Sequence, residues 1–380
     1  MYLERLELQG LVFSVIGQGN ESVNLILQIV YLGSFLLFML YGQKFQTWVM
    51  LREISGAVDR LKRMKDDART LAIQTVKELG QEEVDPAPRI DHFMELFTIL
   101  PVSLDPSGIV PKIRNVFDVR EKRFEDEVQL IAPSADKTWA SNLEGVLEVA
   151  MGLNQIYRIV NHFYLLGKKS MSLYVIMQIQ MQLPLIMRMA EAYSEAIKAF
   201  SEGQPIGDGV GALVAAKLMY GHPSHDVAKE IVVAEVAFEG RSLMVLKAEG
   251  PGSTVGKPGE AIKNAIEAQS GSVDMVIMID AAGKYEGEKS GETSEGVGPA
   301  IGGIGVDQFT IEEISLKHEI PVHAVIVKES IEESVSPMTK DIFNGADVAL
   351  ARVKRIILEG TKEGDTVIVA GIGNTVGIGQ

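Results

Sequence analysis

The sequence predicts an α/β protein with an N-terminal transmembrane helix, a helical middle region and a C-terminal three-layer α/β domain with a mostly parallel sheet. Three observations predict this organisation. They are a long uncharged apolar segment, a middle region with helically spaced apolar residues, and a glycine-rich C-terminal half in which apolar runs alternate with helical patterns. The predicted boundaries are 1–46 for the N-terminal segment and anchor, 47–200 for a helical stalk and oligomerisation region, and 201–380 for the α/β domain.

The predicted transmembrane helix lies between Ser22 and Gln43, a stretch without charged side chains. This stretch is long enough for the roughly 20-residue helix that crosses a bilayer. Positive residues stay on the cytoplasmic side, so those that follow the stretch predict a single-pass protein of the cell membrane with its C-terminal domain in the cytoplasm. They are Lys44, Arg52, Arg60, Lys62, Arg63 and Lys65, against Arg5 alone before it. A cleaved signal peptide fits poorly because acidic residues precede the apolar run, and a buried core helix is the remaining alternative.

The composition argues against several classes of protein. A formal net charge of -15 over 380 residues makes nucleic acid an unfavourable partner, because binding a polyanion requires clustered Lys and Arg. The absence of Cys excludes disulfides, thiolate metal sites and cysteine nucleophiles.

The middle region is predicted to form a helical stalk over 48–79 and a further helix over 139–166. The segment 172–189 is apolar on nearly every side and rich in Met. Two alternatives remain for it: a second membrane span, or a buried helix at a subunit interface. Three glutamines and Pro184 are costly in hydrocarbon, so the sequence favours the subunit interface and with it a homo-oligomer.

The C-terminal half is predicted to contain βα units. The expected strands are 231–238, 242–248, 275–279, 322–327 and 366–370, and the expected helices are 211–220, 259–269, 311–318 and 338–359. Ligands of open α/β sheets bind beyond the carboxyl ends of the strands, so residues at those ends are the candidates for chemistry.

Three carboxylates stand at such positions. Asp208 lies in a glycine-flanked turn before a helix, Asp280 ends an apolar strand, and Asp307 follows a glycine-rich loop before another helix. Each has a structural alternative, because Asp208 and Asp307 can cap helices and Asp280 can cap a strand end.

The order of these motifs resembles that of two peptidase families. Residues 207–218, G-D-G-V-G-x-x-V-A-x-x-L, are similar to the glycine-flanked carboxylate motif of the hydrogenase-maturation endopeptidases and the spore-germination protease. V-I-M-I-D-A-A at 276–282 resembles their second carboxylate strand, and 303–327 resembles their later loop, helix and strand. The resemblance covers roughly 205–380 and implies a phosphorylase-like or hydrolase-like fold with Asp208 and Asp280 as catalytic residues.

One element of that resemblance is displaced. The families' first strand and G-x-G-N turn are missing before Asp208, but the chain ends with a strand and the turn Gly371-Ile372-Gly373-Asn374. We therefore expect a circular permutation that places the last strand beside the Asp208 helix, with Gly373 and Asn374 at the site. A dinucleotide fingerprint at this turn is a weak alternative, because no helix follows it before the chain ends.

The segment 250–257 resembles a phosphate loop, although Pro258 breaks the usual spacing after Lys257. We expect it to form an active-site loop or an anion-binding nest, with Gly252, Ser253 and Lys257 as binding residues.

Two kinds of chemistry follow if the carboxylates converge. Asp208 and Asp280 can share a proton and activate water, or Asp208, Asp280 and Asp307 can hold a divalent metal. In the hydrogenase-maturation enzymes the third metal ligand is a His, at a position that the resemblance gives to Asp307.

The sequence thus predicts a membrane-anchored peptidase or related hydrolase that acts on a protein or peptide. The alternatives are a non-catalytic membrane sensor that binds a small molecule or nucleotide, and an oligomeric scaffold. The whole chain also resembles an uncharacterised archaeal family of membrane-anchored proteins, which implies no chemistry.

Overall fold

The computed structural model describes residues 21–79, 85–102 and 108–379. The chain divides into two compact units, Met1–Asp59 with Ile159–Pro184, and Arg60–Arg158 with Leu185–Gln380. The part of the anchor prediction that concerns residues 1–20, including Arg5, lies outside the described residues.

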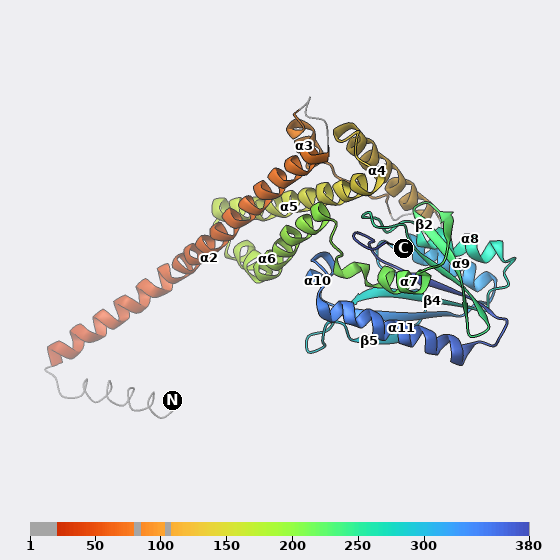
Figure 1. The fold of residues 1–380 in the computed structure, drawn as a ribbon. Coiled ribbons are helices and arrows are strands. Elements are labelled where there is room, and N and C mark those ends of the chain that lie inside the picture. The colour runs from red at the N-terminus through yellow and green to blue at the C-terminus, as the bar shows by residue number, and fades with distance from the viewer. Residues whose placement is uncertain (1–20, 80–84, 103–107, 380) are drawn as a thin grey trace. The chain divides into compact units, whose positions relative to one another are not determined.

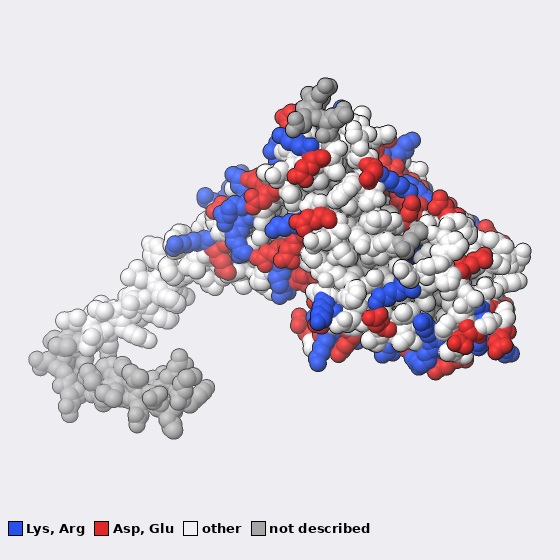
Figure 2. Space-filling view, viewed as in Figure 1, with Lys and Arg blue, Asp and Glu red and all other residues white. Residues whose placement is uncertain are grey.

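Helix α2 (Glu21–Leu79) contains the predicted anchor segment, which lies in the first unit. Among the described helices, none alone is long and apolar enough to cross a membrane, so the single helix expected between Ser22 and Gln43 is not found as one span. The segments Leu25–Met39 and Lys44–Leu79, bent by 44° relative to each other, meet the length and composition requirement together. The apolar half of α2 carries no blue or red side chains in Figure 2.

The first unit also contains the end of α5 (Lys137–Ser170) and the start of α6 (Leu173–Glu202), which form a helical hairpin. Gly167 lets the two helices approach closely, because a Cβ there would lie 2.8 Å from Ile176 Cγ1 and 3.9 Å from Leu51 Cδ2 of α2. The hairpin therefore packs against α2.

In the second unit, α3 (Ala87–Phe93) and α4 (Ile109–Ile131) join the remaining parts of α2, α5 and α6. The rings of Phe93 and Phe124 are 4.6 Å apart and link α3 to α4. Both side chains are buried, so this contact belongs to an apolar core within the helical part of the unit.

The same unit holds a seven-stranded sheet in the order β1-β2-β3-β7-β4-β6-β5 (Figure 1). Its strands are β1 (Ser224–Ala228), β2 (Ile231–Phe238), β3 (Arg241–Ala248), β4 (Met275–Gly283), β5 (Thr293–Val297), β6 (Val322–Glu329) and β7 (Thr366–Gly371). The last strand of the chain, β7, is central and pairs in parallel with both β3 and β4.

The sheet is mixed, so the prediction of a mostly parallel sheet is wrong. The pairs β3·β7, β7·β4 and β4·β6 are parallel, whereas β1·β2, β2·β3 and β6·β5 are antiparallel. For β1·β2 and β2·β3 the reason lies in the short connections, because a parallel crossover needs a dozen or more residues. Only Glu239 and Gly240 separate β2 from β3, and both have positive φ, as a two-residue hairpin turn requires.

Helices cover both faces of the sheet and give three layers (Figure 1). On one face, α7 (Val210–Met219) and α11 (Lys340–Gly360) pack against side chains such as Val245, Ile277 and Val369. On the other, α8 (Pro258–Ala268) and α9 (Val306–Lys317) pack against alternate residues of the same strands, such as Val276 and Ile368. The alternation follows from the two-residue period of a strand, which places successive side chains on opposite faces.

Candidate functional site

Asp208 lies where α7 meets the turn that follows β7. A short 3-10 turn (Gly207–Gly209) precedes α7, and the Asp208 Oδ2 atom accepts a hydrogen bond of 2.8 Å from the backbone N–H of Asn374. The chain's last strand and its G-x-G-N turn therefore lie beside Asp208, as the permutation hypothesis requires. Burial raises the pKa of the Asp208 carboxyl, and the Asn374 amide partly opposes this effect.

Asp280 faces the same buried region from β4. It lies within the strand rather than after it and is only 7% exposed. Its Oδ1 atom accepts a hydrogen bond of 2.8 Å from the Ala281 amide. Burial, followed by the negative charge of Asp208, raises the pKa of Asp280 to about 8. The side chain is therefore a neutral acid at pH 7, next to a second carboxyl.

Glu329, at the end of β6, is a third acid of this cluster, and the sequence analysis did not identify it. It is 1% exposed, and neither carboxylate oxygen has a hydrogen-bond partner among the described residues. Burial and the charges of Asp208, Glu333 and Asp280 raise its pKa to about 8. The criterion that selected Asp280, an acid at the carboxyl end of an apolar strand, would have selected Glu329 as well.

Asp307 does not join these acids, so the structure does not bring the predicted metal set of Asp208, Asp280 and Asp307 together. The Asp307 Oδ1 atom accepts a hydrogen bond of 3.0 Å from the Gly259 amide in the first turn of α8, where carboxylates stabilise helices. In the part of the chain that the structure describes, no group of three or more Asp, Glu or His side chains could hold a metal ion. The structural alternative, a cap on the helix that follows, is not observed either, because Asp307 lies in the first turn of α9 and its carboxylate binds the first turn of α8 instead.

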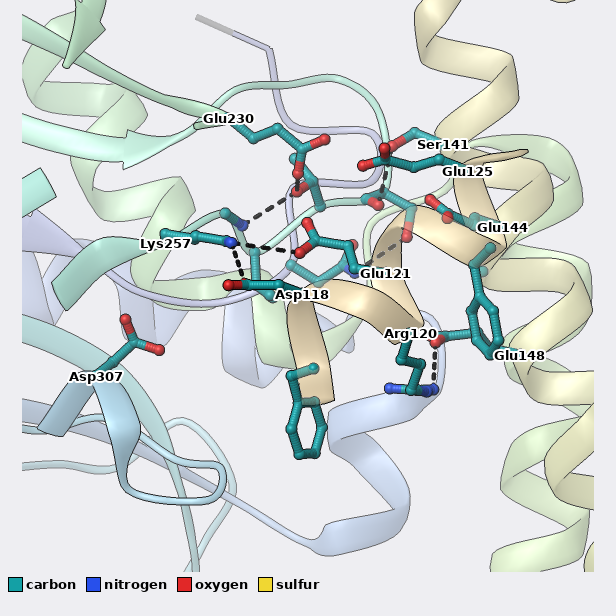
Figure 3. Close-up of a pocket in the computed structure, with 18 of the residues that line it drawn as sticks. Asp118, Arg120, Glu121, Glu125, Ser141, Glu144, Glu148, Glu230, Lys257 and Asp307 are labelled. Carbon is teal, nitrogen blue, oxygen red and sulfur yellow. Dashed lines mark hydrogen bonds and ion pairs between the residues drawn. The ribbon is translucent and has the colours of Figure 1, made fainter. Parts of the chain in front are cut away.

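A cavity of about 400 Å³ contains most of the predicted binding residues (Figure 3). Helices α4 and α5 form one wall, and Ser253, Lys257, Asp307 and Asn374 lie on the opposite side. Its volume falls in the range of small-molecule pockets. Of the other predicted binding residues, Gly252 lines a smaller neighbouring pocket and Gly373 lines neither of these two.

Asn374 connects the cavity to the buried acids. Its backbone N–H binds Asp208, while its side-chain Nδ2 atom donates to Ser253 Oγ at 3.1 Å. Asn374 itself lines the cavity. One residue of the C-terminal turn therefore contacts both the carboxylate cluster and the loop 250–257.

The cavity lining is strongly acidic. Its carboxylates are Asp118, Glu121, Glu125, Glu144, Glu148, Glu230, Glu260 and Asp307, against the cations Arg114, Arg120 and Lys257. Lys257 binds Asp118 at 2.5 Å and Arg120 binds Glu148 at 2.6 Å, so these two cations are already paired. This charge does not fit the anion that the phosphate-loop resemblance implies.

Glu144 shows the excess of negative charge most clearly. Burial, together with the charges of Glu148, Glu125, Glu230 and Glu121, raises its pKa to about 8. The carboxyl thus holds a proton at neutral pH, first because burial disfavours its charged form and second because the neighbouring carboxylates repel that charge.

Together, the fold and the site define an α/β protein with a helical N-terminal half and buried acids beside the C-terminal turn of a mixed sheet. Two family models match the chain: "Protein of unknown function (DUF1512) N-terminal domain" over residues 28–203 and "Domain of unknown function (DUF1512) C-terminal" over 206–379. The chain belongs to the DUF1512 family. No curated protein matches it. The two matches meet just before Asp208.

Proposed function

We propose that the chain is a membrane-anchored hydrolase of the peptidase type in which Asp208 and Asp280 form an acid–base pair. The observation that carries this proposal is the convergence of the two side chains, which come from the 3-10 turn before α7 and from β4, in a buried region where the charge of Asp208 raises the pKa of Asp280. Two carboxyls in such an arrangement hold one proton as a unit. That is the protonation state from which water can be activated.

The chemistry needs no group beyond these two residues and water. The ionised Asp208 accepts a proton from water as the water oxygen attacks the substrate carbonyl carbon, and Asp280 donates its proton to the carbonyl oxygen. The tetrahedral intermediate then collapses: its hydroxyl returns the proton to Asp280, the C–N bond breaks, and Asp208 passes its proton to the leaving amine. The Asn374 amide orients Asp208 throughout.

The anchor is part of the same proposal. The apolar side chains of α2 from Leu25 to Met39 are mostly exposed. The basic residues from Lys44 onward favour a cytoplasmic location for the rest of the chain. The proposed substrate is a protein or peptide at the cytoplasmic face of the cell membrane.

The test is a comparison of full-length protein and its Asp208→Asn variant in lipid nanodiscs, with peptide and ester libraries as substrates. We expect Asp208→Asn to lower the rate on any cleaved substrate by on the order of 10³-fold, because asparagine cannot accept the proton of water. Asp347→Asn is the matched control, since Asp347 lies on the surface of α11 and, among the described residues, its ion pair is with Lys217. Equal rates in the two Asp variants would refute the proposal.

A second candidate function is the binding of a small cationic molecule in the acidic cavity, which corresponds to a membrane sensor. The excess of carboxylates and the raised pKa of Glu144 favour a ligand with amine groups over a nucleotide.

A calorimetric titration of full-length protein with spermidine tests whether the cavity binds a small cationic molecule. We expect Glu144→Gln to weaken binding about tenfold, because a buried partner of the ligand charge is lost, and Glu313→Gln on the surface of α9 to leave the affinity unchanged. Binding of ATP in place of the amine, or equal affinities in the two variants, would contradict it.

A further inference from the structure

The hairpin of α5 and α6 exposes a group of large apolar side chains in the first unit. Tyr174 is 71% exposed and Met181 is 79% exposed. Further exposed apolar residues near the turn are Phe163, Leu165, Leu166, Met171 and Met177. On the packed side of the same hairpin, Ile176 and Leu183 are buried. The hairpin thus has one face that packs and another apolar face without a partner among the described residues.

The charge of this hairpin is the opposite of that of the chain. Residues 159–184 contain Lys168 and Lys169 but no Asp or Glu, although the whole chain has a net charge of -15. Both lysines lie in the last turn of α5, next to the exposed Leu165, Leu166 and Met171. A mixture of apolar, aromatic and basic side chains without carboxylates suits the headgroup layer of an anionic membrane.

The hairpin also lies close to the anchor. At its turn end the hairpin contacts α2, because a Cβ on Gly167 would lie 3.9 Å from Leu51 Cδ2. Further from the turn, Gln180 Nε2 donates a hydrogen bond of 2.7 Å to Glu53 Oε2. Leu51 follows the end of the uncharged stretch at Gln43 by eight residues, or about 12 Å of helix. The α2 segment between them carries Lys44 and the exposed Trp48, the residue types of a membrane interface.

We propose that the tip of the α5–α6 hairpin, residues 163–181, is a second membrane contact that lies in the headgroup layer of the cytoplasmic leaflet. The proposal rests on the membrane anchor proposed above and adds to it a surface that holds the first unit against the bilayer. Lys168 and Lys169 contact anionic headgroups, while Tyr174, Met177 and Met181 enter the boundary of the acyl chains.

The composition of the hairpin fits a surface contact better than a span. Gln178, Gln180 and Gln182 recur along α6, and Pro184 lies within the same helix. These groups are costly in hydrocarbon but are readily hydrated at the interface. A helix that lies in the interface places its apolar face in lipid and leaves its other face for protein or water.

The absence of Cys from the chain permits a direct test with single-cysteine variants of the full-length protein. Tyr174→Cys and Met181→Cys probe the hairpin tip, Phe38→Cys probes the anchor, and Leu316→Cys probes an exposed apolar position on α9; all four native side chains are at least 70% exposed. Each variant carries a nitroxide label in nanodiscs with anionic lipid, and its collision rates with oxygen and with a water-soluble nickel complex are compared.

We expect the ratio of oxygen to nickel collisions at Tyr174 and Met181 to exceed that at Leu316 by at least about fivefold, and to fall when Lys168 and Lys169 are both replaced by Glu. Labels at the hairpin that resemble Leu316 while Phe38 lies in lipid would overturn the inference and leave the anchor intact. Labels shielded from both reagents, together with disulfides that form between copies of the unlabelled Tyr174→Cys and Met181→Cys variants under oxidising conditions, would overturn it in favour of a subunit interface. If Phe38 also met the nickel complex, the anchor itself would fail.

Discussion

Replacement of Asp280 by Asn is expected to remove the proposed hydrolytic activity and, at alkaline pH, to stabilise the protein. Asn keeps the shape of a protonated carboxyl, but it cannot donate an acidic proton to the substrate carbonyl. A loss of on the order of 10³-fold in rate follows if the proton transfer is part of the rate-limiting step.

The stability effect follows from the raised pKa. In the folded protein the pKa of Asp280 is about 8, against an ordinary value of 3.8 for an Asp carboxyl in water. Between these values the folded state binds more protons than the unfolded state, so the free energy of unfolding falls as the pH rises. The stabilising contribution is therefore fully present below about pH 4 and is lost as the pH passes 8. A displacement of about four units corresponds to roughly 5 kcal/mol.

Thermal unfolding of the full-length protein from pH 4 to pH 9 measures this effect. We expect the Tm of Asp280→Asn to exceed that of the native chain at pH 9 by about 10–20 °C and to approach it at pH 4. Asp347→Asn, with the same chemical change on the surface, should follow the native profile. Parallel profiles for Asp280→Asn and the native chain would show that Asp280 is ionised at low cost and cannot serve as the acid.

The sequence was sufficient to predict the elements of the C-terminal domain that are long and strongly apolar. The expected strands 275–279, 322–327 and 366–370 are the cores of β4, β6 and β7. The antiparallel edge strands β1 and β5 were not predicted, because their residues are mostly polar and half-exposed and show no apolar run.

Residues of the candidate site were predicted correctly where a sequence motif indicated which residue would lie beside them. They were not predicted correctly where the sequence showed only that an acid follows a loop. The turn ending at Asn374 was matched to Asp208 by its resemblance to G-x-G-N, and the two residues are hydrogen bonded. Asp307 was grouped with the acids by its place after a loop, but its partner is the first turn of α8, a contact between two helices that local patterns do not encode. Glu329 was missed because the predicted strand ended at residue 327, two residues before the end of β6, so Glu329 was not recognised as an acid at a strand end.

Gly211→Ala is expected to lower the free energy of unfolding by about 3 kcal/mol or more and to disrupt the site. A Cβ at position 211 would lie 2.2 Å from the Ile279 carbonyl oxygen and 2.3 Å from the Ile372 carbonyl oxygen. Both atoms belong to backbone, one in the middle of β4 and the other directly after β7, and the Ile372 N–H donates to the Ile279 oxygen at 2.8 Å. No side-chain rotation relieves such contacts, so α7 must move away from the sheet.

The sign of the change in stability of Gly211→Ala shows whether helix propensity or steric contact has the larger effect. Within a helix, Ala is favoured over Gly by up to about 1 kcal/mol, so intrinsic propensity alone predicts that Gly211→Ala stabilises the protein. The steric contacts with two strands oppose this gain and are expected to exceed it, giving a fall in Tm of about 6–12 °C. Gly296→Ala in β5 is the matched control, because a Cβ there meets only Ala324 Cβ at 3.9 Å and its effect should stay within about 0.5 kcal/mol.

The same variant reports on the site, because Asp208 lies three residues before Gly211 and moves with α7. Displacement of α7 breaks the hydrogen bond from the Asn374 amide to Asp208, so hydrogen exchange at Asn374 should become faster in Gly211→Ala and stay unchanged in Gly296→Ala. If Gly211→Ala left both the Tm and the exchange at Asn374 unchanged, the close approach of α7 to β4 and to Ile372 would not be needed for the hydrogen bond between Asp208 and Asn374.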